Sequence, residues 1–381
     1  MTDTDQLEAL QQRIEGILLG GSRRYTRADV AERSGVPAER ARALWRALGF
    51  ASAADDAAVF TDGDIRALRI ANELIQGGIV DPSIATSTAR MIAQHMSRLA
   101  ESQVRMLRDV LVANPELGAD ERQLARLIEH LTPELEALQN FVWRRHLAAN
   151  SVRMLASPDD DLDERRQIVG FADMVGFTSL TRRSTEAELV AVVDRFDALA
   201  ADVVAENHGR IVKMLGDEVL FVADSPVDGA EIALTLLERA EREDGVPSLR
   251  AGLAYGRVLS RFGDVYGSVV NIASRLTSVA RPGTVLVDIE LAGALEDSAA
   301  YTIRPRRPVS VRGYPRLRSA ALRRVGEEAP TLAESAQQIA AELLSLIGDS
   351  DETEEAPHIP LEPDDEGTTP RRNRRRRRKR D

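Results

Sequence analysis

The sequence predicts a chain in two parts, an all-α domain followed by an α/β domain. Residues 1–149 are rich in Ala, Leu, Glu and Arg and contain few strand-like runs, which favours helices. An acidic breaker follows at 157–161. Regular alternation of apolar and polar residues resumes at Gln167, as in half-buried strands. A length of 381 residues gives room for two ordinary domains.

Composition narrows the functional classes. Hydrophobic residues make up 43% of the chain, enough for buried cores, and the absence of Cys excludes disulfides and thiolate metal sites. The net charge of -11 argues against a protein that coats nucleic acid. No apolar run approaches the length of a membrane span and the first residues are polar, so we expect a cytoplasmic protein without a membrane span.

The spacing of apolar residues and the charge pattern predict the elements and boundaries along the chain. Helices are expected over 5–18, 28–34, 37–48, 62–75, 83–114 and 119–155, the last interrupted near Thr132 and Pro133. The expected parts are a helical domain at 1–134, a connecting helix and linker at 135–164, an α/β domain at 165–326, a C-terminal helix at 327–348 and a tail at 349–381. The tail carries nine acids over 349–366 and nine bases over 371–380. We expect such charge blocks, which contain few apolar residues, to stay disordered.

A helix, a glycine turn and a second helix lie over 25–48 and resemble the helix-turn-helix of MerR-type regulators. DNA binding would use Arg40, Arg42 and Arg46 on the second helix. Acids and bases nearly cancel over 1–60, however, so the basic footprint of a DNA-binding domain is missing. We therefore expect a packed regulatory module and do not expect nucleic acid as a partner.

Two acidic residues stand where strands of the second domain turn. Asp173 follows the apolar run 168–171 and Asp217 follows Ile211 and Val212, and each lies close to a glycine. This pattern predicts a strand that ends in a tight turn with a carboxylate at its tip. Two such carboxylates on adjacent strands suit Mg²⁺ or Mn²⁺, which bind carboxylates together with substrate phosphates. The alternative is that both are ordinary turn acids.

Two further segments carry groups suited to phosphate chemistry. Gly176, Phe177 and Thr178 open a helical pattern, and free backbone N–H groups at a helix start attract phosphate. Asn271 and Arg275 lie four residues apart on a predicted helix and so share one face. An amide and a guanidinium that project together suit the charge that develops on a transferred phosphoryl group. The alternative is an exposed polar helix face.

Together these segments resemble the class III nucleotidyl cyclases over about 166–325. The resemblance depends on the occurrence, in this order, of FADMVGFTSL, GRIVKMLGDEVLF, GLAYGRV and GDVYGSVVNIASRL. It implies a ferredoxin-like βαββαβ core and cyclisation of a nucleoside triphosphate with release of pyrophosphate, using two Mg²⁺ or Mn²⁺ ions per site. The roles that it implies are metal binding by Asp173 and Asp217, adenine recognition by Lys213 and Asp264, transition-state stabilisation by Asn271 and Arg275, and phosphate binding by Arg257 and Arg312.

The residues expected to read the base favour ATP as the substrate. Adenine offers an amino donor at N6 and an acceptor at N1, which an Asp acceptor and a Lys donor complement. Guanine reverses this edge, and guanylate cyclases of the family typically carry Glu and Cys there, whereas this chain has Lys213 and Asp264 and no Cys. The wrong base would leave buried polar groups unpaired. We therefore expect an adenylate cyclase, with a guanylate cyclase as the alternative.

The resemblance also implies a homodimer and a regulatory role for the helical domain. In this family one subunit supplies the metal-binding pair and its partner the adenine and transition-state residues, so two copies of this chain would build two complete sites. The helical region is similar to that of soluble, autoregulated actinobacterial cyclases. We expect a small-molecule effector or a pH response, with His95, His130 and His146 as candidate sensors. The rival hypothesis is a DNA-binding regulator that uses the cyclase fold to sense nucleotide and to dimerise.

Overall fold

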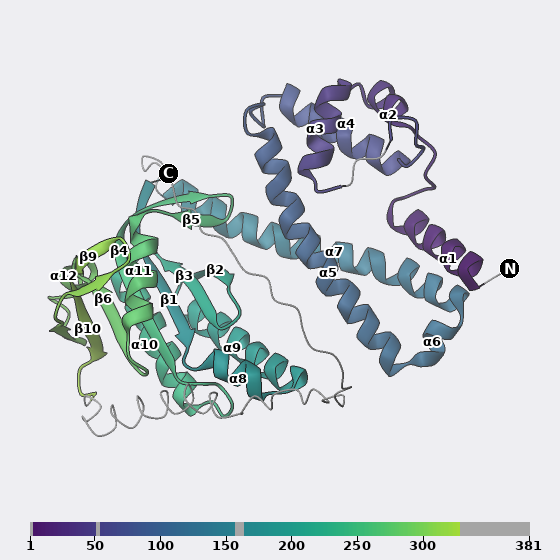
Figure 1. Ribbon diagram of the computed structural model, residues 1–381. Helices are drawn as coiled ribbons and strands as arrows, with labels where there is room; N and C mark the ends of the chain where they lie inside the picture. The colour runs from purple at the N-terminus through teal and green to yellow at the C-terminus, as the bar shows by residue number, and fades with distance from the viewer. Residues whose placement is uncertain (1–2, 51–53, 157–163, 328–381) are drawn as a thin grey trace, which may run out of the picture. The chain divides into compact units, whose positions relative to one another are not determined.

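The computed structural model describes residues 3–50, 54–156 and 164–327, which fall into two compact units (Figure 1). The described part of the first unit lies within 1–166 and 256–270, and that of the second within 167–255 and 271–327. The predicted tail, the linker at 157–163 and the C-terminal helix beyond Glu327 lie outside the described residues. Within those ranges, no helix combines the length and apolar character needed to cross a membrane.

The first unit is helical apart from its segment 256–270, and its helices lie close to the predicted spans. Two of the helices begin with capping boxes, at Thr26 and at Thr61. In each, the threonine hydroxyl accepts a hydrogen bond from the backbone N–H three residues later. Gly35, at a φ of 70°, ends a helix in the left-handed conformation, which confirms the predicted glycine turn. The helices are α1 (Asp3–Leu18), α2 (Arg27–Ser34), α3 (Ala38–Ala47), α4 (Asp62–Gln76), α5 (Ala85–Ala113), α6 (Pro115–Ala119) and α7 (Glu121–Ala156).

A small apolar core holds α2, α3 and α4 together as a helix-turn-helix with one further helix. Val30, Leu44 and Phe60 are each at most 5% exposed, and Trp45 packs edge-on against Phe60 with 4.8 Å between ring centroids. Burial of side chains of this size contributes about 1.5–3 kcal/mol each. The region is therefore a packed module.

Two of the three arginines considered for DNA binding make contacts inside this module. Arg40 donates from Nη1 to Oδ1 of Asn72 at 3.3 Å. Arg42 lies 3.5 Å from Glu39 and 3.9 Å from Asp55. These contacts engage guanidinium groups that a DNA-binding helix would direct toward phosphates or bases.

The expected break near Thr132 and Pro133 is wrong, because α7 runs through both residues. A proline inside a helix removes one N–H and leaves a carbonyl of the preceding turn without its helical donor. The Thr132 hydroxyl donates to the Ile128 carbonyl at 2.8 Å and so adds a hydrogen bond in that turn. The connecting helix predicted from 135 onward is the second half of this single 36-residue helix.

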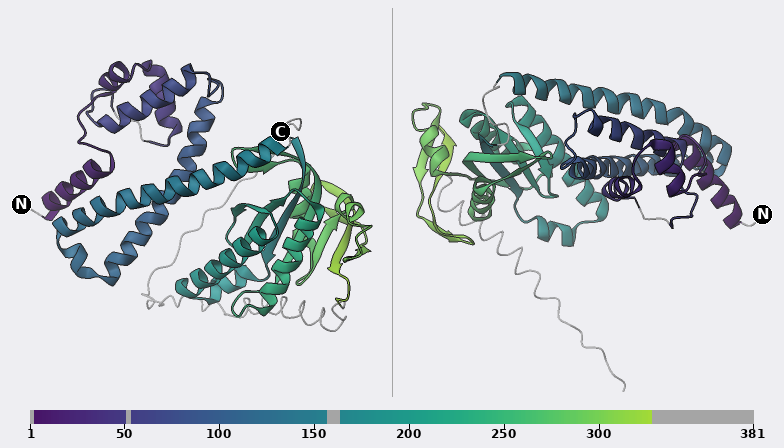
Figure 2. Two further views of the ribbon diagram at one scale, coloured as in Figure 1. Left: turned by 180° about the vertical axis from the view of Figure 1, so that it is seen from behind. Right: turned by 90° about the horizontal axis from the view of Figure 1, so that it is seen from above.

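The second unit is built on a mixed sheet (Figures 1 and 2). Its strand order is β2-β3-β1-β4-β6-β10-β7, with β5 paired to β4, and β8 and β9 form a separate pair. The first four of its long strands, with α9 and α10 between them, follow the βαββαβ order, which confirms the ferredoxin-like core. The strands are β1 (Glu164–Met174), β2 (Arg210–Met214), β3 (Glu218–Ala223), β4 (Leu249–Arg261), β5 (Asp264–Tyr266), β6 (Val285–Asp288), β7 (Tyr301–Pro305), β8 (Val309–Val311), β9 (Tyr314–Leu317) and β10 (Ser319–Arg324).

Helices cover the sheet because alternate residues of its strands are apolar on both faces. On β6, Val285 and Val287 join the large core that contains residues of α9 and α10, whereas Leu286 joins a second cluster with Leu276 of α11. The period of two along a strand sends neighbouring side chains to opposite faces. The helices of this unit are α8 (Phe177–Arg183), α9 (Glu186–Glu206), α10 (Pro226–Arg242), α11 (Ser268–Val279) and α12 (Ile289–Ala294).

Candidate active site

Asp173 and Asp217 are brought together where adjacent strands turn. Asp173 stands near the end of β1, in register with Glu218 at the start of β3, and Asp217 precedes that strand. Gly216 makes the turn possible with a φ of 79°, a conformation that favours glycine. The Met174 N–H donates to the Asp217 carbonyl at 2.9 Å and ties the two segments together. The predicted placement of both acids at strand ends is confirmed.

Burial and neighbouring charges raise the pKa of two carboxyl groups here, those of Asp173 and Glu218. Burial raises the pKa of Asp173, the Arg250 guanidinium opposes this shift, and the nearby charge of Asp217 adds to it. Burial, followed by the charges of Asp173 and Asp217, raises the pKa of Glu218 to about 7. A cluster of this kind gains from a cation placed among its members.

Arg250 and Glu218 were not singled out from the sequence. Arg250 lies on β4 and pairs with Asp173, with 2.6 Å between its Nη2 and Oδ2 of the acid. The available signal was a lone cation in the apolar run 249–254, where a buried strand has no reason to carry a charge without a partner. Glu218 follows Asp217 directly, and only the register of β1 against β3 shows that it faces Asp173.

The donor set fits a hard divalent cation that arrives with phosphate. Among the described residues, no group of three or more His, Cys, Asp or Glu side chains is arranged as a complete metal cage. Mg²⁺ and Mn²⁺ do not require one, because they commonly bind one or two carboxylates and take their other ligands from water and substrate phosphates. Asp173 and Asp217 supply such a pair.

The start of α8 lies directly after the first acid. Gly176 caps the helix with a φ of 75°, and the N–H groups of Ser179 and Leu180 each donate to its carbonyl at 3.0 Å. The amides of Phe177 and Thr178 precede these first helical hydrogen bonds, at the end where N–H groups have no acceptor within the helix. The predicted helix start is therefore confirmed.

Asn271 and Arg275 lie one turn apart on α11, which packs closely on β4. A Cβ at Gly252 of β4 would lie 2.2 Å from the Thr277 nitrogen and 2.6 Å from the Ala273 carbonyl oxygen, so only glycine admits the helix this close. Asn271 is exposed and Arg275 is half-buried. The close contact fixes the height of both side chains above the sheet.

The other predicted residues are distributed over both units. Lys213 is half-buried on β2, opposite Leu220, and Arg312 is exposed in the turn between β8 and β9. Arg257 and Asp264 belong to the segment 256–270, which is part of the first unit. The Asp264 carboxylate accepts a hydrogen bond from the Val265 N–H at 2.9 Å at the start of β5. No single chain unit therefore contains the whole predicted set.

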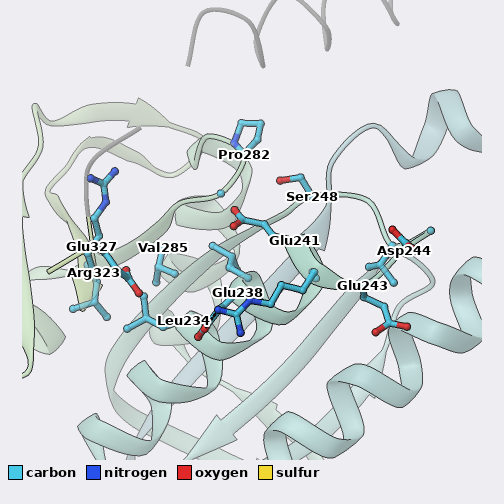
Figure 3. A pocket seen from close by; sticks show the side chains of 17 residues that line it. Leu234, Glu238, Glu241, Glu243, Asp244, Ser248, Pro282, Val285, Arg323 and Glu327 are labelled. Atoms are coloured by element: carbon cyan, nitrogen blue, oxygen red, sulfur yellow. Dashed lines mark ion pairs between the residues drawn. The ribbon is translucent and has the colours of Figure 1, made fainter. Parts of the chain in front are cut away.

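A pocket of about 1030 Å³ opens elsewhere on the second unit (Figure 3). It lies between the end of α10 and the residues around Pro282, and its rim carries Glu238, Glu241 and Asp244. Glu238 is paired with Arg242 at 2.7 Å. None of the residues predicted for the active site lines this pocket, so we do not assign it to the substrate.

Known proteins match both the catalytic region and most of the chain. Residues 165–323 match the family described as the adenylate and guanylate cyclase catalytic domain. An adenylate cyclase of Streptomyces coelicolor is 44% identical over 76% of this chain and 76% of its own length, and one of Streptomyces griseus is 43% identical over 74% and 71%. An adenylate cyclase of Glutamicibacter nicotianae is 37% identical over 81% and 80%. The chain therefore belongs to the class III adenylate cyclases.

Proposed function

We propose that two copies of this chain convert ATP into 3′,5′-cyclic AMP and pyrophosphate at two equivalent sites between them. The observation that carries the proposal is the carboxylate pair, Asp173 and Asp217, held at adjacent strand turns of the sheet on which α11 packs. Membership of the adenylate cyclase family supports the reaction. The acidic cluster supports the use of divalent metal ions, which a phosphoryl transfer needs to neutralise its charge.

The proposed reaction is the cyclisation of ATP at its α-phosphorus. The ribose 3′-hydroxyl releases its proton to water, to the substrate or to Asp173, and its oxygen attacks the α-phosphorus. The bond from that phosphorus to the pyrophosphate oxygen breaks, and pyrophosphate leaves. When bound, divalent metal ions would supply the positive charge that lowers the basicity of the attacking oxygen and polarises the phosphates. Asp173 and Asp217 would hold these ions, two per site. Arg275 places a fixed cation for the negative charge of the transition state, and Asn271 orients the ribose.

The remaining predicted residues bind the substrate. Lys213 donates to the adenine N1 and Asp264 accepts from its N6 amino group, which gives ATP an advantage over GTP. Arg257, Arg312 and the amides of Gly176, Phe177 and Thr178 would bind the phosphates. Lys213 and Asp264 would therefore determine the preference for ATP over GTP.

A homodimer fits the distribution of these groups. One subunit supplies Asp173 and Asp217, and its partner supplies the adenine-reading and transition-state residues, Lys213, Asp264, Asn271 and Arg275. Because every chain carries both sets, a two-fold pair builds two identical sites. The metal-binding residues of one copy and the transition-state residues of the other are then needed at the same site, and neither copy is active alone.

We also propose that the helical domain regulates the cyclase through the segment that carries Asp264. That segment, 256–270, groups with the helical unit, and a Cβ on Gly263 would lie 3.6 Å from Nε2 of His95. α7 also exposes Leu138, Phe141 and further apolar side chains, as an element that packs against a partner would. A displacement of about 1 Å at a reacting centre can cost around a hundredfold in rate.

The decisive test incubates the purified full chain with ATP or GTP and with Mg²⁺ or Mn²⁺, and resolves the products by chromatography. We expect cyclic AMP from ATP and little product from GTP. Asp173→Ala and Asp217→Ala should each abolish the reaction while the protein still folds and dimerises. Turnover near that of the wild type in either variant would contradict the metal assignment.

A second test addresses regulation. Removing 1–156 should change the specific activity several-fold at matched dimer concentration, and it should alter any dependence on pH between about 5 and 8. A shortened chain that dimerises and gives the same profile as the full chain would show that the helical domain does not regulate the enzyme.

A further inference from the structure

Arg250 holds one oxygen of Asp173 through two hydrogen-bonding groups. Its Nε lies 2.8 Å and its Nη2 lies 2.6 Å from the same atom, Oδ2. The two side chains are 26% and 15% exposed, so solvent screens the pair only in part. Charge-assisted hydrogen bonds of this length are about twice as strong as neutral ones.

The backbone around Arg250 is tied to the chain that follows Asp173. The Val175 N–H donates to the Ser248 carbonyl at 2.9 Å, and the neighbouring Leu249 is fully buried. Arg250 therefore starts from a fixed point on β4. A guanidinium is planar and presents its N–H groups as a rigid fork, so Nε and Nη2 together fix the position of Oδ2.

The two oxygens of Asp173 are consequently unequal. Both bonds from Arg250 go to Oδ2, and neither goes to Oδ1. We propose that Arg250 is a positioning residue for the metal site, which fixes the Asp173 carboxylate so that Oδ1 is the oxygen left for a divalent cation. This inference rests on the proposed function, in which Asp173 and Asp217 hold the metal ions.

A simpler role for Arg250 would be to balance the charge of three neighbouring carboxylates, Asp173, Asp217 and Glu218. Lysine separates the two roles. Arg250→Lys keeps the positive charge, but an ammonium group is a point charge that cannot reproduce the fork. If charge is all that matters, the lysine variant binds metal as the wild type does. If the fork matters, the variant loses affinity.

The test measures Mn²⁺ binding to the full-length, nucleotide-free protein by electron paramagnetic resonance of the unbound ion. Changes to residues that orient a metal ligand typically cost 10–100-fold in affinity or activity, so we expect Arg250→Lys to raise the Kd for Mn²⁺ about tenfold. Arg324→Lys is the matched control. Arg324 is 25% exposed and pairs with Glu231 at 2.7 Å in the same unit, and its replacement should leave Mn²⁺ binding unchanged.

Two further variants keep the outcome unambiguous. Adding Arg250→Lys to Asp173→Ala should cause no further loss of Mn²⁺ affinity, because Arg250 acts through the Asp173 carboxylate. Arg250→Gln should bind Mn²⁺ no more tightly than the wild type, whereas a pure counter-charge role predicts tighter binding once the cation is removed. The Gln variant gives an independent answer if the Lys variant does not fold.

The failures of the two proposals are distinguishable. An unchanged Kd in Arg250→Lys, or a lower Kd in Arg250→Gln, overturns the positioning role while Asp173→Ala still weakens Mn²⁺ binding. If Asp173→Ala itself binds Mn²⁺ like the wild type, the metal site of the proposed function is wrong. Unfolding temperatures equal to that of Arg324→Lys verify that the variants are folded.

Discussion

Replacement of Glu218 by Gln should stabilise the protein above neutral pH. The carboxyl has an ordinary pKa of 4.5, and burial together with Asp173 and Asp217 raises it to about 7 in the folded chain. A shift of about 2.5 units corresponds to about 3.4 kcal/mol at 1.36 kcal/mol per unit. Because the side chain is only partly buried, solvent screening reduces this to on the order of 2 kcal/mol.

The sign follows from proton binding. Between pH 4.5 and about 7 the folded chain holds a proton on Glu218 that the unfolded chain has released. Stability therefore falls as pH rises through this window, and the loss is complete above pH 7. Glu218→Gln removes this loss, so the stability difference between variant and wild type should be near zero below about pH 4.5 and reach about 2 kcal/mol at pH 8.

Urea unfolding in the presence of a chelator measures the free energy of unfolding of the variant and of the wild type at pH 4.5 and pH 8. Hydrogen exchange of peptides from β1 and β3 then measures the same difference locally. Glu243→Gln, a substitution at an exposed position of the same unit, serves as the control and should show no such pH dependence. If the Gln variant has the same stability advantage at pH 4.5 and at pH 8, the reasoning is refuted, because Glu218 is then not kept protonated by burial and by its neighbours.

Two other substitutions test base selection and the position of α11. Lys213→Glu combined with Asp264→Cys should reduce ATP turnover by orders of magnitude, since each lost hydrogen bond to a buried base costs about 1–3 kcal/mol; unchanged kinetics with ATP would remove both residues from the base site. Gly252→Ala should lower the unfolding temperature and reduce kcat at least tenfold, because its methyl would meet the Thr277 nitrogen at 2.2 Å and displace α11. Gly293→Ala, with nothing within 4 Å of the added Cβ, is the control, and equal behaviour of the two variants would contradict the close-packing account.

Local patterns were sufficient to predict much of the fold. Asp173 and Asp217 could be placed at strand ends because an apolar run followed by a glycine turn is a short-range signal. The helices α2 and α4 were predicted from the spacing of apolar residues, which is also a short-range signal. Pro133 misled the prediction, because a proline is a strong local breaker signal but tertiary context and neighbouring hydrogen bonds can carry a helix through it.

Long-range contacts could not be predicted in the same way. Arg250 lies 77 positions after Asp173, and their pairing depends on β1 and β4 being neighbours in the sheet. The pairing of Glu218 with Asp173 likewise depends on strand register, which no single segment encodes. The grouping of 256–270 with the helical unit is also a property of the folded chain and has no local signature.

The most direct test of the composite site mixes two inactive variants, Asp173→Ala and Arg275→Ala. In a mixed dimer one site carries both substitutions and the other carries neither. Random pairing makes about half of the dimers mixed, each with one intact site of two, so the mixture should recover about a quarter of wild-type cyclic AMP formation. A mixture that forms mixed dimers and stays inactive would contradict a site shared between two copies, as would a monomer that cyclises ATP at high dilution.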